Sequence, residues 1–128
     1  MRPLLLASAV LFALTTAASA KDISDNRSTN VQVGETKRLG VLGAHKSDCV
    51  TSIPPTIEVT RAPRLGVLTQ RADVPYTLGT SISGACLGAH LMGTAIDYTG
   101  NSAGRDVLQL DAIFPNGRAH YTITINVR

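Results

Sequence analysis

The sequence predicts an all-β fold, a two-sheet sandwich of about seven short antiparallel strands. Apolar and polar residues alternate with the period of two typical of a half-buried strand, most clearly in TIEVTR at residues 56–61 and YTITINV at residues 121–127. Gly, Pro, Asn and Ser separate these stretches at short intervals, as turn residues do. A helical period is nearly absent from residue 30 onward, so we expect strands and turns throughout the domain.

The first element is residues 1–20, MRPLLLASAVLFALTTAASA. Arg2 gives a positive start, residues 4–14 form an apolar run, and residues 18–20 are a small-residue cleavage site. This is the pattern of a secretory signal peptide, so we expect a periplasmic or secreted mature protein beginning at Lys21. No cysteine lies directly after the cleavage site and no later apolar run is long enough to span a bilayer, so neither a lipid anchor nor a transmembrane segment is expected.

The charge of the chain is small and dispersed. The formal net charge is +3, and without Arg2 eleven Lys and Arg residues face nine Asp and Glu. The basic residues never form a block, and three Tyr, two Phe and no Trp offer few rings on which bases could stack. Nucleic acid is therefore not expected as a partner.

The strands follow a short lead-in. Residues 21–29 are polar without a hydrophobic period, which predicts a flexible segment before a domain of residues 30–128. The expected strands cover residues 30–33, 36–42, 56–61, 67–70, 94–98, 106–114 and 118–127.

Two longer loops interrupt the strands. Residues 44–55 end in two prolines, which cannot enter a central strand. Residues 78–93 are rich in Gly and Ser, and Leu87, Leu91 and Met92 there are expected to form one helical turn. Long loops on rigid sandwiches often bind partners, and a tethered connection without a partner is the alternative.

The last two strands form a hairpin with a defined register. One face of each is apolar: Leu108, Leu110, Ala112 and Phe114 in the first, and Tyr121, Ile123, Ile125 and Val127 in the second. Both sets must face the core, so the register cannot slip by one residue. Pro115 cannot adopt the positive φ of a two-residue type I′ turn, which predicts a four-residue loop, or a three-residue loop with a bulge. Either loop places Asp111 and His120 side by side on the outer face.

The C-terminal half resembles a known kind of module. Tyr98 is followed by a Gly-rich turn at residues 100–103, then by Gly104-Arg105-Asp106, by Asn116-Gly117, and by the final alternating strand. These motifs, with Ala62-Pro63 and Gly66-Val67 upstream, resemble bacterial immunoglobulin-like and cadherin-like sandwich modules over residues 56–128.

The resemblance implies an immunoglobulin-like fold in which Tyr98, Gly104, Asp106 and Gly117 are structural turn residues. Asp106 is expected to accept hydrogen bonds from turn amides. The chain departs from the pattern at Thr99-Gly100, where a proline is common, and it lacks the acidic clusters with which cadherins bind calcium.

The two cysteines of the chain predict one disulfide. Cys49 and Cys86 lie in a chain expected in an oxidising compartment, where such a pair is oxidised by default. Their bridge would link the loop at 44–55 to the loop at 78–93. By restricting the unfolded chain, it would add about 4 kcal/mol to the free energy of unfolding.

Two histidines near the cysteines support an alternative interpretation of this region, as a metal site. His45 lies four residues before Cys49, and His90 four residues after Cys86. A small periplasmic metal-binding protein using His45 and His90, with His120 as a further ligand, is therefore the alternative hypothesis.

A catalytic site is not expected. His120 beside Asp111, with Thr122 as the nearest nucleophile, lies on an open sheet face without an oxyanion hole. The more ordinary interpretation is an exposed cross-strand ion pair. No cofactor is expected.

The sequence therefore predicts a non-enzymatic binding or assembly module whose partner is an unknown protein or glycan. Three alternatives remain open: the metal-binding protein, a surface-assembly subunit that exchanges strands with its neighbours, and a hydrolase or isomerase with a pocket that the sequence does not reveal.

Overall fold

The computed structural model describes residues 21–79 and 86–128, and the expected signal peptide at residues 1–20 lies outside them. The described residues contain nine strands and no helix. The strands are β2 (Lys21–Val31), β3 (Thr36–Leu42), β4 (Ala44–His45), β5 (Ser52–Ile53), β6 (Thr56–Arg61), β7 (Gly66–Thr77), β8 (His90–Gly100), β9 (Gly104–Phe114) and β10 (Gly117–Val127). The all-β prediction is confirmed.

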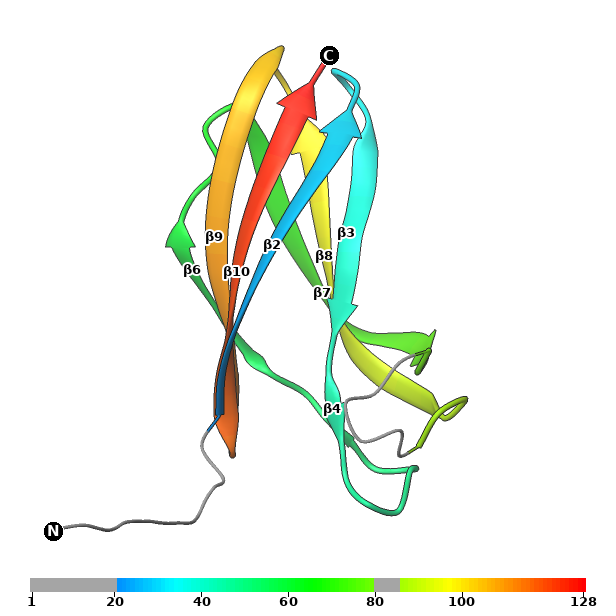
Figure 1. The fold of residues 1–128 in the computed structure, drawn as a ribbon. Coiled ribbons are helices and arrows are strands. Elements are labelled where there is room, and N and C mark those ends of the chain that lie inside the picture. Colours follow the sequence, from blue (N-terminus) through cyan, green and yellow to red (C-terminus); the bar gives the residue numbers. More distant parts are fainter. Residues whose placement is uncertain (1–20, 80–85) are drawn as a thin grey trace, which may run out of the picture.

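The strands form two main sheets, which Figure 1 shows facing each other. One sheet has four strands in the order β2-β10-β9-β6, and the other has three in the order β3-β8-β7. The short strands β4 and β5 pair with each other inside the expected loop at residues 44–55. All neighbouring strands are antiparallel except β2 and β10, which are parallel.

The expectation of a flexible lead-in at residues 21–29 was wrong. These residues belong to β2, which pairs with the whole of β10, from Lys21 opposite Gly117 to Val31 opposite Val127. The sequence signal is weak because β2 is an edge strand with few apolar residues. Its order comes from backbone hydrogen bonds to β10 and from the buried side chain of Val31.

One hydrophobic core receives side chains from both main sheets. Its fully buried members include Tyr98 of β8, Leu108 and Leu110 of β9, and Ile125 of β10. Burial alternates along β10 as the sequence predicts, with Ile123, Ile125 and Val127 buried and Thr124 and Asn126 between them partly exposed. Packing across the two sheets is therefore what holds them together.

The turn between β9 and β10 differs from the prediction. Phe114 pairs with Gly117, so the loop has two residues, Pro115 and Asn116, and neither has a positive φ. Pro, Asn and Gly in this order suit a type I turn, in which both central φ angles are negative. The longer-loop prediction was wrong because it considered only the mirror-image turn among two-residue loops. The register itself is confirmed, with Asp111 opposite His120.

Strands β7 and β8 are longer than expected. β8 begins at His90, so Leu91 and Met92 lie in a strand and the expected helical turn was wrong. β7 continues through Pro75 after a register shift between Arg71 and Val74. It is an edge strand, where a proline is tolerated because no neighbour needs its missing N–H group. The rest of the expected loop at 78–93 includes residues 80–85, which lie outside the described residues.

Candidate functional site

The predicted disulfide is confirmed. Cys49 and Cys86 are bonded, with 5.2 Å between their Cα atoms and a sequence separation of 37. Beside the bridge, the Asp48 carboxylate accepts hydrogen bonds from the amides of Val50 at 2.9 Å and Thr51 at 2.8 Å. The hydroxyl and amide of Thr51, with the Val50 amide, lower the pKa of Asp48 to about 2. The bridge thus joins a tightly bonded turn to the segment that leads into β8.

The two histidines proposed as metal ligands have protein partners. The Nδ1 atom of His45 donates to the backbone carbonyl of Lys46 at 3.0 Å, and that of His90 lies 3.3 Å from the hydroxyl of Thr77. Within residues 21–79 and 86–128, no group of three or more His, Cys, Asp or Glu side chains is arranged to hold a metal ion. The sulfur atoms of Cys49 and Cys86 are engaged in the disulfide.

The turn residues named from the resemblance form one network around Asp106, which is only 2% exposed. Its carboxylate accepts hydrogen bonds from the amides of Arg64 at 2.9 Å and Leu65 at 3.0 Å, and from the hydroxyl of Tyr98 at 2.8 Å. Burial raises the pKa of Asp106, but these donors outweigh burial and hold its pKa below the ordinary value. Asp106 thereby fixes the turn between β6 and β7 against β8 and β9.

Two glycines let this turn approach closely. A Cβ atom on Gly66 would lie 2.5 Å from the Tyr98 ring and would collide with the carbonyl oxygen of Thr99. Gly104 has a φ of 141°, and a Cβ there would lie 3.0 Å from Leu65. Glycine is therefore required at position 66 by close packing and at position 104 by a backbone conformation that L side chains rarely adopt. Gly117 begins β10 immediately after the Pro-Asn turn.

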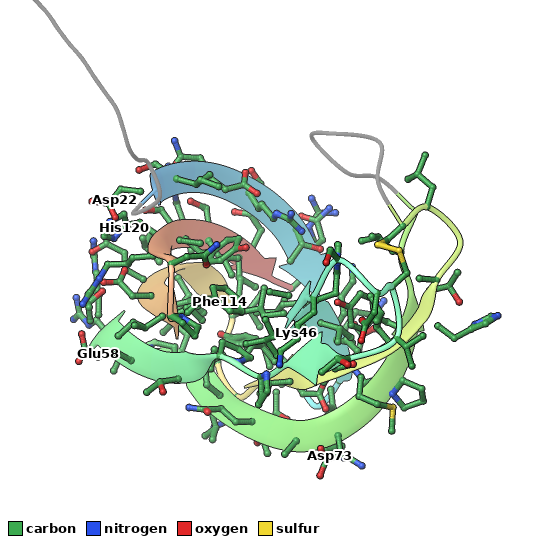
Figure 2. All side chains as sticks on the ribbon, turned by 90° about the horizontal axis from the view of Figure 1, so that it is seen from below. Asp22, Lys46, Glu58, Asp73, Phe114 and His120 are labelled. Carbon is green, nitrogen blue, oxygen red and sulfur yellow. A yellow bond between two sulfur atoms is a disulfide. The ribbon has the colours of Figure 1, made fainter. Side chains whose placement is uncertain are left out.

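The predicted pair of Asp111 and His120 is part of a larger ionic cluster. The Asp111 carboxylate lies 2.8 Å from Nδ1 of His120 and 2.8 Å from Nη1 of Arg118, and the same Arg118 atom lies 3.6 Å from Glu58. Figure 2 shows His120 and Glu58 along the same side of the four-stranded sheet. The expectation of an exposed pair was wrong for Asp111, which is only 6% exposed because β9 lies between β6 and β10.

The Asp111 carboxylate is held by two side-chain donors. Burial raises the pKa of Asp111, but hydrogen bonds from Arg118 and His120 outweigh it and lower the pKa below its ordinary value. The hydroxyl of Thr122, the nearest nucleophile named from sequence, accepts a hydrogen bond from the Gln109 amide at 3.3 Å. The arrangement ties β6, β9 and β10 together.

A row of hollows follows the line where β2 and β3 face each other. We call this line the β2–β3 seam. The first hollow, of about 330 Å³, lies at the end where Figure 2 places Phe114 between the sheets. It is lined mainly by Ile23, Val41, Leu42, Phe114, Arg118 and Tyr121. A narrower apolar hollow shares Leu42 and Tyr121 with it, and a third, of about 300 Å³, shares Leu39 and Ile123 with the second. The shared residues place the three hollows next to one another along the seam, and we refer to them together as its groove.

Both walls of the seam are edge strands. Within the described part of the chain, β2 pairs only with β10 and β3 only with β8, so each leaves its seam-side backbone edge without a strand partner. At the end near residue 30 the seam is closed, because the Lys37 ammonium donates to the Thr29 hydroxyl at 2.8 Å and to the Asn30 carbonyl at 3.1 Å. Sequence reasoning missed this site because it did not recognise β2 as a strand.

Comparisons with known proteins add little. A scan of protein-family models and a search of curated proteins find no match. Among solved structures, the solution structure of Amebosin is similar, with 18% sequence identity and a TM-score of 0.47, over 85% of this chain and 100% of that chain. At this TM-score the likeness identifies neither a fold family nor a function. The described residues also contain no helix that could span a membrane.

Proposed function

We propose that the chain is an exported immunoglobulin-like sandwich that acts without catalysis, by binding an extended polypeptide segment along the β2–β3 seam. The strand order supports the fold. In the immunoglobulin sandwich, strands C, F and G form one sheet and strands B, E and D lie together in the other. The order β6-β9-β10 matches the first set, and β3-β8-β7 matches the second.

Export is supported by the leader pattern at residues 1–20 together with the Cys49–Cys86 disulfide. Disulfides persist in oxidising compartments and are rare in the cytosol. A periplasmic or secreted location accounts for both features.

The observation that carries the binding proposal is the seam itself, a groove with an apolar floor between two unpaired strand edges. An extended segment that lies along β3 would satisfy free backbone groups of that edge, the mode of recognition known as strand addition. Alternate side chains of the added segment would then point into the groove, over Leu39, Leu42 and Tyr121.

Charge further defines the segment. The third hollow is lined by Arg27, Lys37 and Arg38 and by no carboxylate, while the first hollow is lined mainly by apolar residues. Asp25 and Asp97 neutralise Arg27 and Arg38, whereas the Lys37 ammonium donates to two neutral groups, the Thr29 hydroxyl and the Asn30 carbonyl. The favoured segment therefore has apolar residues at one end and an acidic residue at the other.

A random peptide library selected against the immobilised oxidised protein tests this proposal. Ile23 lines the first hollow and is 45% exposed, so Ile23→Arg fills the groove without disturbing the core. Val67→Arg is the matched control, because Val67 is 52% exposed on β7, the edge strand at the far side of the other sheet. We expect enriched peptides to lose at least about tenfold in affinity on Ile23→Arg and less than about twofold on Val67→Arg.

Two results would contradict the proposal. One is a library that yields no peptide specific for the folded protein. The other is a set of peptides whose affinity falls equally in both arginine variants. The melting temperatures of the variants, measured alongside, show whether each remains folded.

A further inference from the structure

Apart from the three hollows of the β2–β3 seam, a further hollow with a different chemistry lies at the other edge of the four-stranded sheet, near β6. It has a volume of about 350 Å³ and is lined by Arg61, Arg64, Leu65, Arg105, Asp106 and Val107. Arg61 ends β6, Arg64 lies in the following turn, and Arg105 is near the start of β9. Three exposed guanidinium groups therefore surround one depression.

These three arginines differ from those paired elsewhere. Arg27, Arg38, Arg71 and Arg118 each have a carboxylate partner. Among the described residues no carboxylate forms an ion pair with Arg61, Arg64 or Arg105. Without such a partner the three guanidinium groups repel one another. A bound anion would relieve this repulsion, so the hollow favours anion binding.

Asp106, in the wall of the hollow, offsets only part of this charge. Its oxygens are already occupied by the Arg64 and Leu65 amides and the Tyr98 hydroxyl. Three cations and this one carboxylate leave a local formal charge of +2. That charge matches a dianionic group.

The turn that carries Arg64 is held in place on both sides. Asp106 binds its amides, and the carbonyl oxygen of Leu65 accepts hydrogen bonds from the amides of Asn101 at 2.8 Å and Ser102 at 3.1 Å. Because the backbone is already ordered, little further conformational entropy is lost there when a ligand binds.

We propose that this hollow, the arginine pocket, binds a tetrahedral dianionic oxyanion, a phosphate or sulfate group. Guanidinium groups form paired, charge-assisted hydrogen bonds to such oxygens, and three of them can surround one group from different sides. The proposal is independent of the β2–β3 seam, since β6 and β2 are the opposite edges of the sheet. The site is open, so the group can be free or part of a larger molecule.

The test is a titration of the oxidised protein with inorganic phosphate at low ionic strength, followed by ¹H–¹⁵N NMR. We expect the shifts to concentrate at residues 61–66 and 104–107 and at the side-chain Nε–H signals of the three arginines. Arg64→Gln and, separately, Arg105→Gln should weaken phosphate binding by about fivefold to tenfold. Added salt should weaken it further, because the site is exposed.

Arg71→Gln is the matched control. It removes the same charge from an exposed arginine on β7, in the other sheet, and should change phosphate affinity by less than about twofold. Unchanged amide spectra away from the pocket establish that each variant is folded. Shifts scattered over all arginines, no binding at all, or an equal loss in Arg71→Gln would overturn the proposal.

Two further probes identify the source of the group. A sulfated oligosaccharide and vesicles of anionic phospholipid are each tested with the wild-type and Arg64→Gln proteins. Arg64-dependent binding of the oligosaccharide assigns the group to a glycan, and Arg64-dependent binding of vesicles assigns it to a lipid headgroup. Arg64-dependent binding of inorganic phosphate alone assigns the site to a free anion.

Discussion

Replacing Asp106 with Asn tests the network that fixes the turn between β6 and β7. The carboxylate binds the Arg64 amide through one oxygen, and the Leu65 amide and Tyr98 hydroxyl through the other. Asn is nearly isosteric but turns one of these two acceptors into an NH₂ donor. In either orientation of the amide, its NH₂ group faces at least one backbone N–H group, so two donors oppose each other without an acceptor.

The expected cost follows from the number of bonds lost. A hydrogen bond to a charged group contributes about 1.5–3 kcal/mol, and a buried donor left without a partner carries its own desolvation cost. We therefore expect Asp106→Asn to lower the free energy of unfolding by about 3 kcal/mol. For a domain of this size that corresponds to a fall in melting temperature of roughly 12–24 °C.

The assay is urea unfolding at pH 7 with the disulfide intact, for the wild type, Asp106→Asn and two controls. Tyr98→Phe leaves both amide bonds to Asp106 in place and should cost about 1 kcal/mol. Asp25→Asn removes an exposed carboxylate that pairs with Arg27 and should cost less than about 1 kcal/mol. A cost for Asp106→Asn no larger than that of Tyr98→Phe would refute this account of the turn.

Three further outcomes are expected. Reduction of the Cys49–Cys86 disulfide should lower the free energy of unfolding by about 4 kcal/mol in urea melts, and an unchanged midpoint would show that the bridge is not structural. Gly66→Ala should cost about 3 kcal/mol or prevent folding, because its Cβ would strike the Tyr98 ring, whereas Gly40→Ala, with no atom within 4 Å of its Cβ, should leave the melting temperature almost unchanged. Because its pKa is lowered on folding, Asp111 stabilises the protein above its unfolded pKa and loses this effect as the pH falls through its folded pKa. The stability difference between the wild type and Asp111→Asn, measured from pH 7 down to pH 2, should therefore shrink on acidification, and a constant difference would contradict this.

The parts of the fold that the sequence predicts well are those where burial alternates along a strand. In β10, Ile123, Ile125 and Val127 fall on one side, which fixes both the register with β9 and the meeting of Asp111 with His120. The disulfide was predicted correctly because a chain with two cysteines offers a single intramolecular bridge.

Elements stabilised by their neighbours were missed. Strand β2 is polar along most of its length and is ordered by hydrogen bonds to β10, which no local pattern reveals. Pro75 lies within β7 because that strand is at a sheet edge, and a strand's place in the sheet depends on the fold as a whole.

The candidate sites were invisible for the same reason. The β2–β3 seam joins residues of the first two strands to Tyr121 near the end of the chain. The arginine pocket joins Arg61 and Arg64 to Arg105, which becomes their neighbour only when β6 pairs with β9. The sequence shows these basic residues as scattered.

Amide hydrogen exchange tests the central claim, that the seam is the binding surface, most directly. The oxidised protein is compared with and without a peptide enriched from the library. The account predicts slower exchange in β3 (Thr36–Leu42) when the peptide is bound, with little change in β6 (Thr56–Arg61) at the opposite edge of the molecule. Unchanged exchange in β3, with protection appearing instead around Cys86 or in β6, would contradict it.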